Sequence, residues 1–247
     1  MTTHCFSNKG KSVPYIPITP QQRFSMAMGY SYQPVKSSTT VTELGGGTNG
    51  TANNMGTGYY YPERGGGQIY LGNTTGYDPS TYKTITLNTL YTSAVSYVIG
   101  FEYVASNAYA GSDIIIGHYD GTRDYWVGLS TSYTGFLISA GGAVRASTGT
   151  AAVAGRKYII MFGISTTQTG FFYVYDSAGN VYSNTSSVVA ATLPTSYSPA
   201  VGSYGTFLPG TYIPRIYVGD VFNFNTLIST TNALAIKDAI KWKYGIS

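Results

Sequence analysis

The sequence predicts a nearly all-β protein: an antiparallel jelly-roll sandwich with an extended irregular N-terminal arm and one short C-terminal helix. Three observations favour this architecture. From residue 68 onward, short apolar-alternating runs rich in Tyr, Ile, Val and Phe recur between Gly, Asn, Asp and Ser residues, as is typical of strands joined by tight turns. The first 67 residues lack that rhythm, and an apolar stripe at helical spacing occurs only near the C-terminus. All-β sandwiches reach 247 residues as one domain.

The segment 1–67 is predicted to be a Pro/Gly/Ser-rich anchoring arm, and 68–247 to be the sandwich. Pro14, Pro17 and Pro20 favour extended, polyproline-like backbone, which cannot pair as a central strand. The arm also carries more apolar side chains than a freely solvated linker tolerates. We therefore expect it to dock on a neighbouring subunit or on its own sandwich, and a disordered tail is the alternative.

Strands are expected wherever an apolar-alternating run of strand length is bounded by turn residues. They are 68–71, 84–90, 97–104, 113–118, 125–130, 135–139, 143–146, 157–164, 171–175, 181–184, 200–204 and 213–223. The two clearest hairpins are 171–175 with 181–183 and 136–139 with 143–145, because glycine in each connection supplies the positive φ that tight turns require.

The C-terminal residues predict a helix of about three turns, packed on the edge of the sandwich. Thr231 or Asn232 can cap its N-terminus, and Gly245 follows as a stop. The apolar stripe is Ala233, Ile236, Ala239 and Ile240. The residues expected to face water are Lys237, Asp238, Lys241 and Lys243.

The composition is poor in charge and rich in tyrosine. Charged residues make up 10% of the chain and aromatic residues 15%, with 25 Tyr and 31 Gly. A surface with so little charge lacks the repulsion that keeps free monomers apart, whereas exposed tyrosines suit contact with a partner. The composition therefore favours a protein that is assembled or displayed, as a homo-oligomer or in many copies.

Several classes of partner and site are not expected. The net charge of +4 comes from thinly spread Lys and Arg, which argues against nucleic acid as a partner. No apolar run approaches the roughly 20 residues that span a bilayer, and Met1 to Lys11 is not followed by the apolar segment of a signal peptide, so neither a membrane nor a secretory leader is expected. The single cysteine, Cys5, excludes an internal disulfide, and beside His4 it lacks the further ligands that zinc needs.

Two stretches carry a family resemblance. Residues 170–182, with the sequence GFFYVYDSAGNVY, resemble the central hairpin of the concanavalin A-like and laminin-G-like jelly rolls. Residues 214–225, with the sequence PRIYVGDVFNFN before the helix, resemble the closing strand of that family. Through its low charge and apolar arm, the whole chain is also similar in composition to the decoration, fibre and adhesin proteins of tailed-bacteriophage virions.

These resemblances imply a non-enzymatic structural protein of a bacteriophage virion surface: a capsid decoration, head-fibre or tail component that displays a lectin-like domain. Its location would be the virion, and its arm would bind the major shell or tail subunit. Two alternatives are a carbohydrate-binding adhesin for host or mucus glycans and a polysaccharide-cleaving hydrolase. The glucanases of this fold carry Glu-x-Asp-x-x-Glu on one strand, but Glu43, Glu63 and Glu102 are isolated, so no catalytic residue is expected.

The densest polar stretch is 113–126, which contains the candidate glycan site. Sugars stack on aromatic faces and bind short acids. The candidate residues are Tyr119, Asp120, Asp124, Tyr125, Trp126 and Tyr133. Asp120 and Asp124 are also weak candidates for Ca²⁺ ligands, although Asp-Gly is a common hairpin turn too, and no other cofactor is expected. Trp126 has the alternative of a core position, and His118, which could act as a base beside Asp120, has that of a structural residue.

Overall fold

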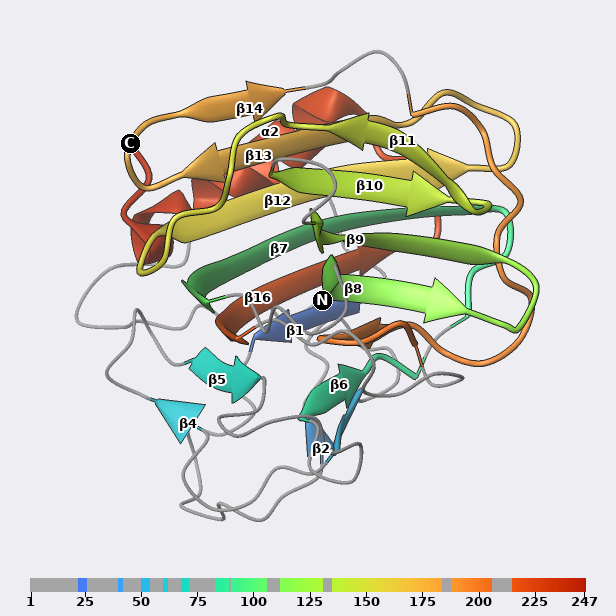
Figure 1. Ribbon diagram of the computed structural model, residues 1–247, viewed down its shortest axis with the longest axis horizontal. Helices are drawn as coiled ribbons and strands as arrows, with labels where there is room; N and C mark the ends of the chain where they lie inside the picture. Colours follow the sequence, from blue (N-terminus) through green and yellow to red (C-terminus); the bar gives the residue numbers. More distant parts are fainter. Residues whose placement is uncertain are drawn as a thin grey trace, which may run out of the picture.

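The computed structural model describes residues 22–25, 40–41, 50–53, 60–61, 68–71, 83–88, 90–105, 112–130, 135–183, 188–205 and 215–247. Within these ranges the chain forms two antiparallel sheets that pack face to face, with a C-terminal helix behind one of them (Figure 1). The predicted all-β sandwich with one short C-terminal helix is confirmed. No helix in these ranges is long and apolar enough to cross a membrane.

The first sheet has the order β14-β13-β12-β7-β16-β5-β4, and β1 pairs with a separate stretch of β16. Its strands are β1 (Gln22–Ser25), β4 (Tyr60–Tyr61), β5 (Gln68–Leu71), β7 (Ala94–Ala105), β12 (Lys157–Ser165), β13 (Phe171–Asp176), β14 (Val181–Ser183) and β16 (Arg215–Phe224). The long strands β7, β12 and β16 occupy the middle of this sheet.

The second sheet has the order β11-β10-β9-β8-β15-β6-β3-β2. Its strands are β2 (Thr40–Val41), β3 (Gly50–Asn53), β6 (Thr84–Thr86), β8 (Ser112–Tyr119), β9 (Asp124–Ser130), β10 (Phe136–Ala140), β11 (Ala143–Ser147) and β15 (Ala200–Val201). The turns that join β8 to β9 and β10 to β11 lie at the same end of this sheet, at the right in Figure 1.

Every expected strand range contains an observed strand, and two of them end early. The strand expected over 84–90 stops at Thr86, and Asn88 shortly after it has a positive φ of 51°. The strand expected over 200–204 is only Ala200–Val201, because Gly202 turns the chain with a φ of 80°. Local φ at these two positions, rather than hydrophobic pattern, sets the strand ends.

Four strands fall within the segment that the sequence assigned to an arm. Phe24 of β1 pairs with Val221 of β16, and Ala52 of β3 pairs with Ile85 of β6. The described parts of this segment therefore lie on the chain's own sandwich, which is one of the two docking alternatives. The prolines at 14, 17 and 20 lie outside the described residues, and the division at residue 67 stays a prediction.

The core fills the space between the two sheets with aliphatic and aromatic side chains. One polar contact crosses it: the hydroxyl groups of Tyr97 on β7 and Tyr125 on β9 are 2.9 Å apart. Both side chains are at most 1% exposed, and burial raises the pKa of each hydroxyl. Because both hydroxyls find a partner, the large rings fill the core without leaving these polar atoms unsatisfied.

The helix α2 (Thr230–Ile240) continues into the 3₁₀ helix η2 (Lys241–Tyr244). The predicted stripe is confirmed, since the four buried residues of α2 are Ala233, Ile236, Ala239 and Ile240. The N-cap is Ser229 rather than Thr231 or Asn232, and its side chain accepts from the backbone N–H of Asn232 at 3.2 Å.

The position of the helix corrects the prediction that it packs on the sandwich edge. Its apolar face contacts Val98, Met161 and Phe222, which lie on the outer face of the three central strands of the first sheet. A face contact buries far more of the helix than an edge contact would, and it covers the second hydrophobic side of that sheet.

Two of the lysines that were expected to face water are engaged instead. Lys237 Nζ lies 4.6 Å from the ring centroid of Tyr175, and Lys243 Nζ donates to both carboxylate oxygens of the buried Asp220 at 3.0 Å. The Tyr244 hydroxyl also donates to Asp220, and it accepts from the Asp220 backbone N–H. These contacts fasten η2 to β16.

Two glycines make room for the Tyr244 ring. A Cβ on Gly100 would lie 2.1 Å from Cζ of Tyr244, and one on Gly219 would lie 2.3 Å from its hydroxyl oxygen. The pairing of β16 with β7 shifts register between Val218 and Asp220, as in a β-bulge. The extra residue lets the strand present a carboxylate to the helix side while its apolar residues keep facing the core.

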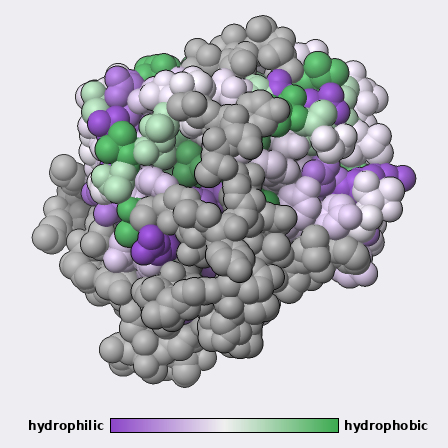
Figure 2. Space-filling model, viewed as in Figure 1, coloured by the Kyte–Doolittle hydropathy of each residue, from purple (hydrophilic) through white to green (hydrophobic). Residues whose placement is uncertain are grey.

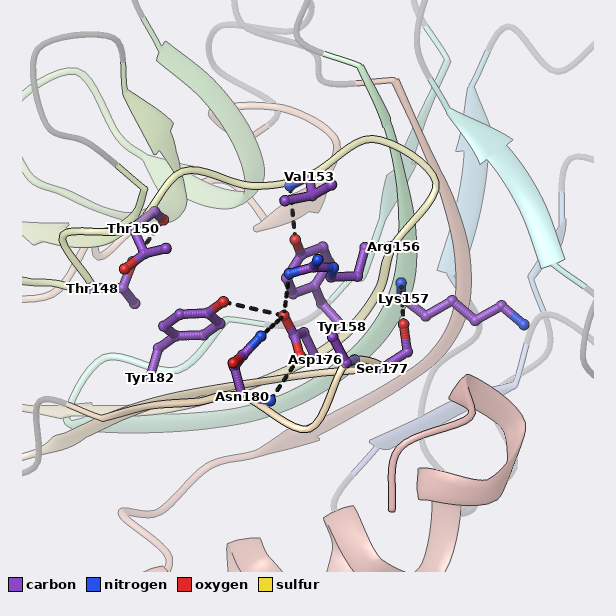
Figure 3. A network of polar contacts seen from close by, with 11 residues as sticks. Thr148, Thr150, Val153, Arg156, Lys157, Tyr158, Asp176, Ser177, Asn180 and Tyr182 are labelled. Atoms are coloured by element: carbon purple, nitrogen blue, oxygen red, sulfur yellow. Dashed lines mark hydrogen bonds and ion pairs between the residues drawn. The ribbon is translucent and has the colours of Figure 1, made fainter.

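A second buried carboxylate organises the hairpin between β13 and β14. The side chain of Asp176 is completely buried (Figure 3). Its donors are the backbone N–H groups of Ala178 and Asn180, the side-chain amide of Asn180, the Tyr182 hydroxyl and Arg156 Nη1. Burial acts to raise the pKa of Asp176, but the hydrogen bonds from Asn180, Ala178 and Arg156 outweigh it and hold the pKa below its usual value.

Candidate functional site

The turn between β8 and β9 is held by the side chain of Asp120. Asp120 Oδ1 accepts from the backbone N–H groups of Thr122 at 3.0 Å and Arg123 at 2.8 Å, which closes the turn. Asp120 Oδ2 accepts from the backbone N–H of Thr195 at 2.8 Å. One carboxylate thus joins this turn to a loop that is distant in the sequence. Burial acts to raise the pKa of Asp120, and the three backbone hydrogen bonds outweigh it and lower the pKa.

Asp124 joins two further loops to the same end of the sheet. Its Oδ1 accepts from the backbone N–H of Gly142 at 2.7 Å, in the turn between β10 and β11. Its Oδ2 accepts a short hydrogen bond from the hydroxyl of Tyr204, which follows β15. Asp124 is 7% exposed, so its carboxylate serves the fold rather than solvent.

Asp120 and Asp124, the two weak candidates for Ca²⁺ ligands, therefore accept hydrogen bonds from the protein itself on both carboxylate oxygens. Ca²⁺ takes six to eight oxygen ligands, and acidic residues supply most of its charge compensation. Across the described ranges, no group of three or more His, Cys, Asp or Glu residues is placed to hold a metal ion. His4 and Cys5 lie outside those ranges.

An aromatic cluster formed by Tyr119, Trp126 and Tyr204 adjoins Asp124. The ring centroids of Tyr119 and Tyr204 are 5.1 Å apart, and those of Trp126 and Tyr204 are 6.5 Å apart. All three side chains are partly exposed. The sequence indicated Tyr119 and Trp126 and missed Tyr204, which reaches them because Gly117 lets the backbone of 203–204 lie against β8.

Of the residues predicted for the glycan site, Tyr125 does not belong to the surface and Tyr133 is not described. Tyr125 is 1% exposed and bonds to Tyr97, so including it in a surface site was wrong. Alternation along β9 explains this, because Tyr125 and Val127 point into the core while Trp126 points outward. Trp126 is thus not the core residue that its alternative interpretation proposed. Tyr133 lies outside the described residues.

The loop after Leu193 presents an exposed tyrosine in an unusual backbone conformation. Tyr197 has a φ of 65° and is 50% exposed. A bulky residue at positive φ is an outlier that persists only when its surroundings impose it, and such residues cluster at binding sites. We call Asp120, Arg123, Thr195 and Tyr197 the turn site. Arg123 Nη1 donates to Thr195 Oγ1 at 3.2 Å, so the two halves of the site are joined by side chains as well.

His118 fixes the tyrosine-bearing loop from below. It is fully buried at the end of β8, its ring meets Tyr125 edge-on with centroids 5.4 Å apart, and its Nε2 is 3.0 Å from the carbonyl oxygen of Ser196. Because a carbonyl only accepts, Nε2 carries the proton. Burial lowers the pKa of His118, although the Ser196 carbonyl and the Asp120 charge act in the opposite direction. This geometry supports the structural interpretation of His118 rather than that of a base.

His118 should make the free energy of unfolding depend on pH in the mildly acidic range. Its pKa in the folded protein is lowered from 6.5, so the unfolded chain binds a proton that the folded chain does not. The free energy of unfolding should therefore be highest above pH 6.5 and fall as the pH decreases toward the folded pKa. Urea unfolding of wild type and His118→Gln between pH 7.5 and 5 measures this, since Gln keeps a donor for Ser196 without titrating. Equal slopes in the two proteins would contradict the assignment.

No protein-family model and no curated protein sequence matches the chain. Solved structures do match its fold. A Trypanosoma rangeli sialidase superposes with a TM-score of 0.59 at 12% identity, over 99% of this chain and 36% of the sialidase. The chain therefore spans about a third of that enzyme's length.

Two smaller domains match as well. Domain 4 of a GH43 extracellular arabinanase from Geobacillus stearothermophilus, solved with arabinotriose, gives a TM-score of 0.55 at 13% identity, over 90% of this chain and 98% of that domain. The binding domain of botulinum neurotoxin DC, in complex with SialylT, gives 0.57 at 7% identity, over 93% of this chain and 52% of that one. At these identities the similarity shows the fold alone, a β-sandwich.

Proposed function

We propose that this chain is a carbohydrate-binding domain, of the adhesin type, that holds a glycan at the turn site without cleaving it. The observation that carries the proposal is Tyr197, an exposed aromatic ring held at positive φ by a loop that Asp120 and His118 fasten at neighbouring residues. A ring fixed in this way needs little further ordering when it binds, which reduces the entropic cost of association.

The chemistry around Tyr197 suits a sugar. A tyrosine face offers an apolar surface to the C–H groups of a pyranose, and its hydroxyl is a polar group at the edge of that surface. The exposed Thr195 and Thr122 and the partly exposed Arg123 belong to the turn and loop that Asp120 joins, and they add hydroxyl and guanidinium groups that can bond to sugar hydroxyls. A few polar groups beside an aromatic surface are the usual composition of a small-ligand site.

The state of the carboxylates supports binding without hydrolysis. A glycosidase needs one carboxylic acid and one carboxylate that are available to the scissile bond and to water. At this end of the sheet, Asp120 and Asp124 each accept hydrogen bonds on both oxygens from the fold. A general acid requires a raised pKa, whereas the pKa of Asp120 is lowered.

The solved structures of similar fold support a glycan ligand. The arabinanase domain was solved with arabinotriose, the toxin binding domain with SialylT, and the Trypanosoma rangeli sialidase also with sialic acid. They support this function over the structural virion role predicted from composition. A bacteriophage virion surface stays a predicted location for the chain, and shell or tail proteins stay predicted partners.

The surface that the chain presents is compatible with a soluble sugar ligand. On the described part of the face in Figure 2, hydrophobic residues form separate patches among polar ones. Separate patches of this kind are normal on a protein surface and do not by themselves indicate a protein interface.

Replacing Tyr197 with alanine should weaken glycan binding about tenfold, the equivalent of 1.4 kcal/mol, because the stacking surface is lost. A glycan array identifies the bound oligosaccharide, and titration calorimetry of wild type, Tyr197→Ala and Tyr197→Phe measures the effect; Phe should retain most of the affinity. Trp242→Ala, which removes an exposed aromatic ring on η2, is the matched control. Equal losses in the Tyr197 and Trp242 variants, or release of shortened products from the bound sugar, would contradict the proposal.

A further inference from the structure

We propose that the glycan bound at the turn site is acidic, and that Arg123 receives its carboxylate. This inference rests on the proposed function and names the ligand class for the same site. It comes from comparing the hydrogen-bond acceptors with the hydrogen-bond donors at the end of the second sheet where β8 turns into β9.

The carboxylate acceptors at this end of the sheet already accept hydrogen bonds from the protein. Asp120 takes three backbone N–H groups on its two oxygens, and Asp124 takes one N–H and one hydroxyl. These bonds reach from 2.7 to 3.0 Å for the N–H donors, so both carboxylates are firmly coordinated by the protein. A ligand rich in donors would find no free carboxylate here.

The donors are not used in the same way. Within the part of the chain that the structure describes, Arg123 makes one side-chain hydrogen bond, from Nη1 to Thr195 Oγ1, and a guanidinium has five N–H groups. Among the described residues, no carboxylate lies within ion-pair distance of Arg123. The charge of Arg123 contributes to the lowered pKa of the nearby Asp120, but the oxygens of Asp120 accept from three backbone N–H groups and not from the guanidinium. The hydrogen-bonding groups that remain available at the turn site are therefore the cationic N–H donors of Arg123.

The contact to Thr195 also sets the direction of the guanidinium. Because Thr195 is bonded through its N–H to Asp120 and through its hydroxyl to Arg123, the arginine is held toward the loop that carries Tyr197. A planar guanidinium binds a carboxylate through two parallel N–H···O bonds, a geometry that lysine cannot reproduce. A sugar stacked on Tyr197 with its carboxylate on Arg123 satisfies both groups.

A second arginine follows the neighbouring turn at the same end of the sheet. Arg145 follows the turn between β10 and β11, whose Gly142 is bonded to Asp124, and its Nε donates to the Ala140 carbonyl oxygen at 2.8 Å. Within the described ranges, Arg145 has no carboxylate partner. Its positive charge helps to offset the negative charges of Asp120 and Asp124, which would otherwise repel an acidic ligand.

The test uses an array of matched pairs, in which each uronic- or sialic-acid oligosaccharide stands beside its carboxyl-reduced neutral counterpart. Wild type should bind at least one acidic member about tenfold more tightly than its reduced partner, and the acidic affinity should decrease with added salt. Arg123→Gln should remove the difference within the pair by weakening only the acidic member. Arg123→Lys should restore part of it, because the charge returns without the bidentate geometry.

Lys241→Gln is the control, since it removes one positive charge from an exposed lysine on η2 and leaves the turn site intact. It should preserve the preference for the acidic member, and a preference lost equally in this variant would show a net-charge effect and overturn the inference. Equal binding of acidic and reduced members by wild type would also overturn it, while leaving the proposed function standing. Absence of binding to every member of the array would overturn both.

Discussion

Replacing Ile236 and Ile240 together with alanine is expected to lower the free energy of unfolding by about 4 to 8 kcal/mol, at roughly 2 to 4 kcal/mol for each buried isoleucine, cavity included. The two side chains are 0% and 2% exposed and lie one helical turn apart. They fill the space between α2 and the outer face of the first sheet, against Val98 and Met161. Domain stability is usually about 5 to 15 kcal/mol, so the loss is a large fraction of the total.

Urea unfolding at pH 7.5 measures this effect, and each single variant should be measured because neighbouring substitutions need not be additive. Lys241→Ala is the matched helix variant: its side chain is 38% exposed and it should change the stability by less than about 0.5 kcal/mol. Protein that remains folded should keep its glycan binding, since the turn site lies on the other sheet. If replacing the two isoleucines left the free energy of unfolding unchanged, the helix would not be packed as the structure shows.

Replacing Asp176 with alanine is expected to cost about 2 to 3 kcal/mol, because the Asn180 amide, the Tyr182 hydroxyl and two backbone N–H groups lose their acceptor together. The loss should be smaller than the value of about 3 to 5 kcal/mol for a fully buried ion pair, since Arg156 is 27% exposed and can turn toward water. Asp176→Asn keeps one carbonyl oxygen as an acceptor and should cost less than alanine does.

The pH dependence separates the charge from the shape of this side chain. The pKa of Asp176 is lowered in the folded state, so its contribution is complete above the unfolded value of 3.8 and is lost as the pH falls through the folded pKa. The stability difference between wild type and Asp176→Asn should therefore shrink in acid. Ser177→Ala, next in the same turn, removes only a 3.3 Å contact to the Lys157 N–H and should be nearly neutral. A difference that stays constant down to pH 2.5 would contradict the role of the charge.

The local pattern of the sequence was enough for most of the fold. Period-2 runs of Tyr, Ile, Val and Phe predict strands because alternate side chains must face one core, and each expected range contains one. The helical stripe from Ala233 to Ile240 is confirmed residue by residue. The errors are at element ends, where a single φ at Asn88 or Gly202 decides, and local hydrophobicity does not report that angle.

The candidate site was only half visible in the sequence. The dense polar stretch 113–126 marked the β8–β9 turn, and Tyr119, Asp120 and Trp126 lie there with their side chains at the surface or in the turn. Thr195 and Tyr197 could not be found in this way, because their loop meets Asp120 through Thr195 and His118 through Ser196, in contacts that cross about 75 positions of the chain. No local motif encodes which two loops meet at the end of a sheet.

The sequence by itself determined the strand and helix content, the face of the helix that is buried and the hairpins with glycine turns, since each depends on side chains within a few residues of one another. Only the tertiary structure decided that Asp120 and Asp124 act as acceptors for the fold, that Tyr125 belongs to the core, and that the helix covers a sheet face. Those outcomes depend on which strands become neighbours, and strand pairing over long separations is set by the packing of the whole sandwich.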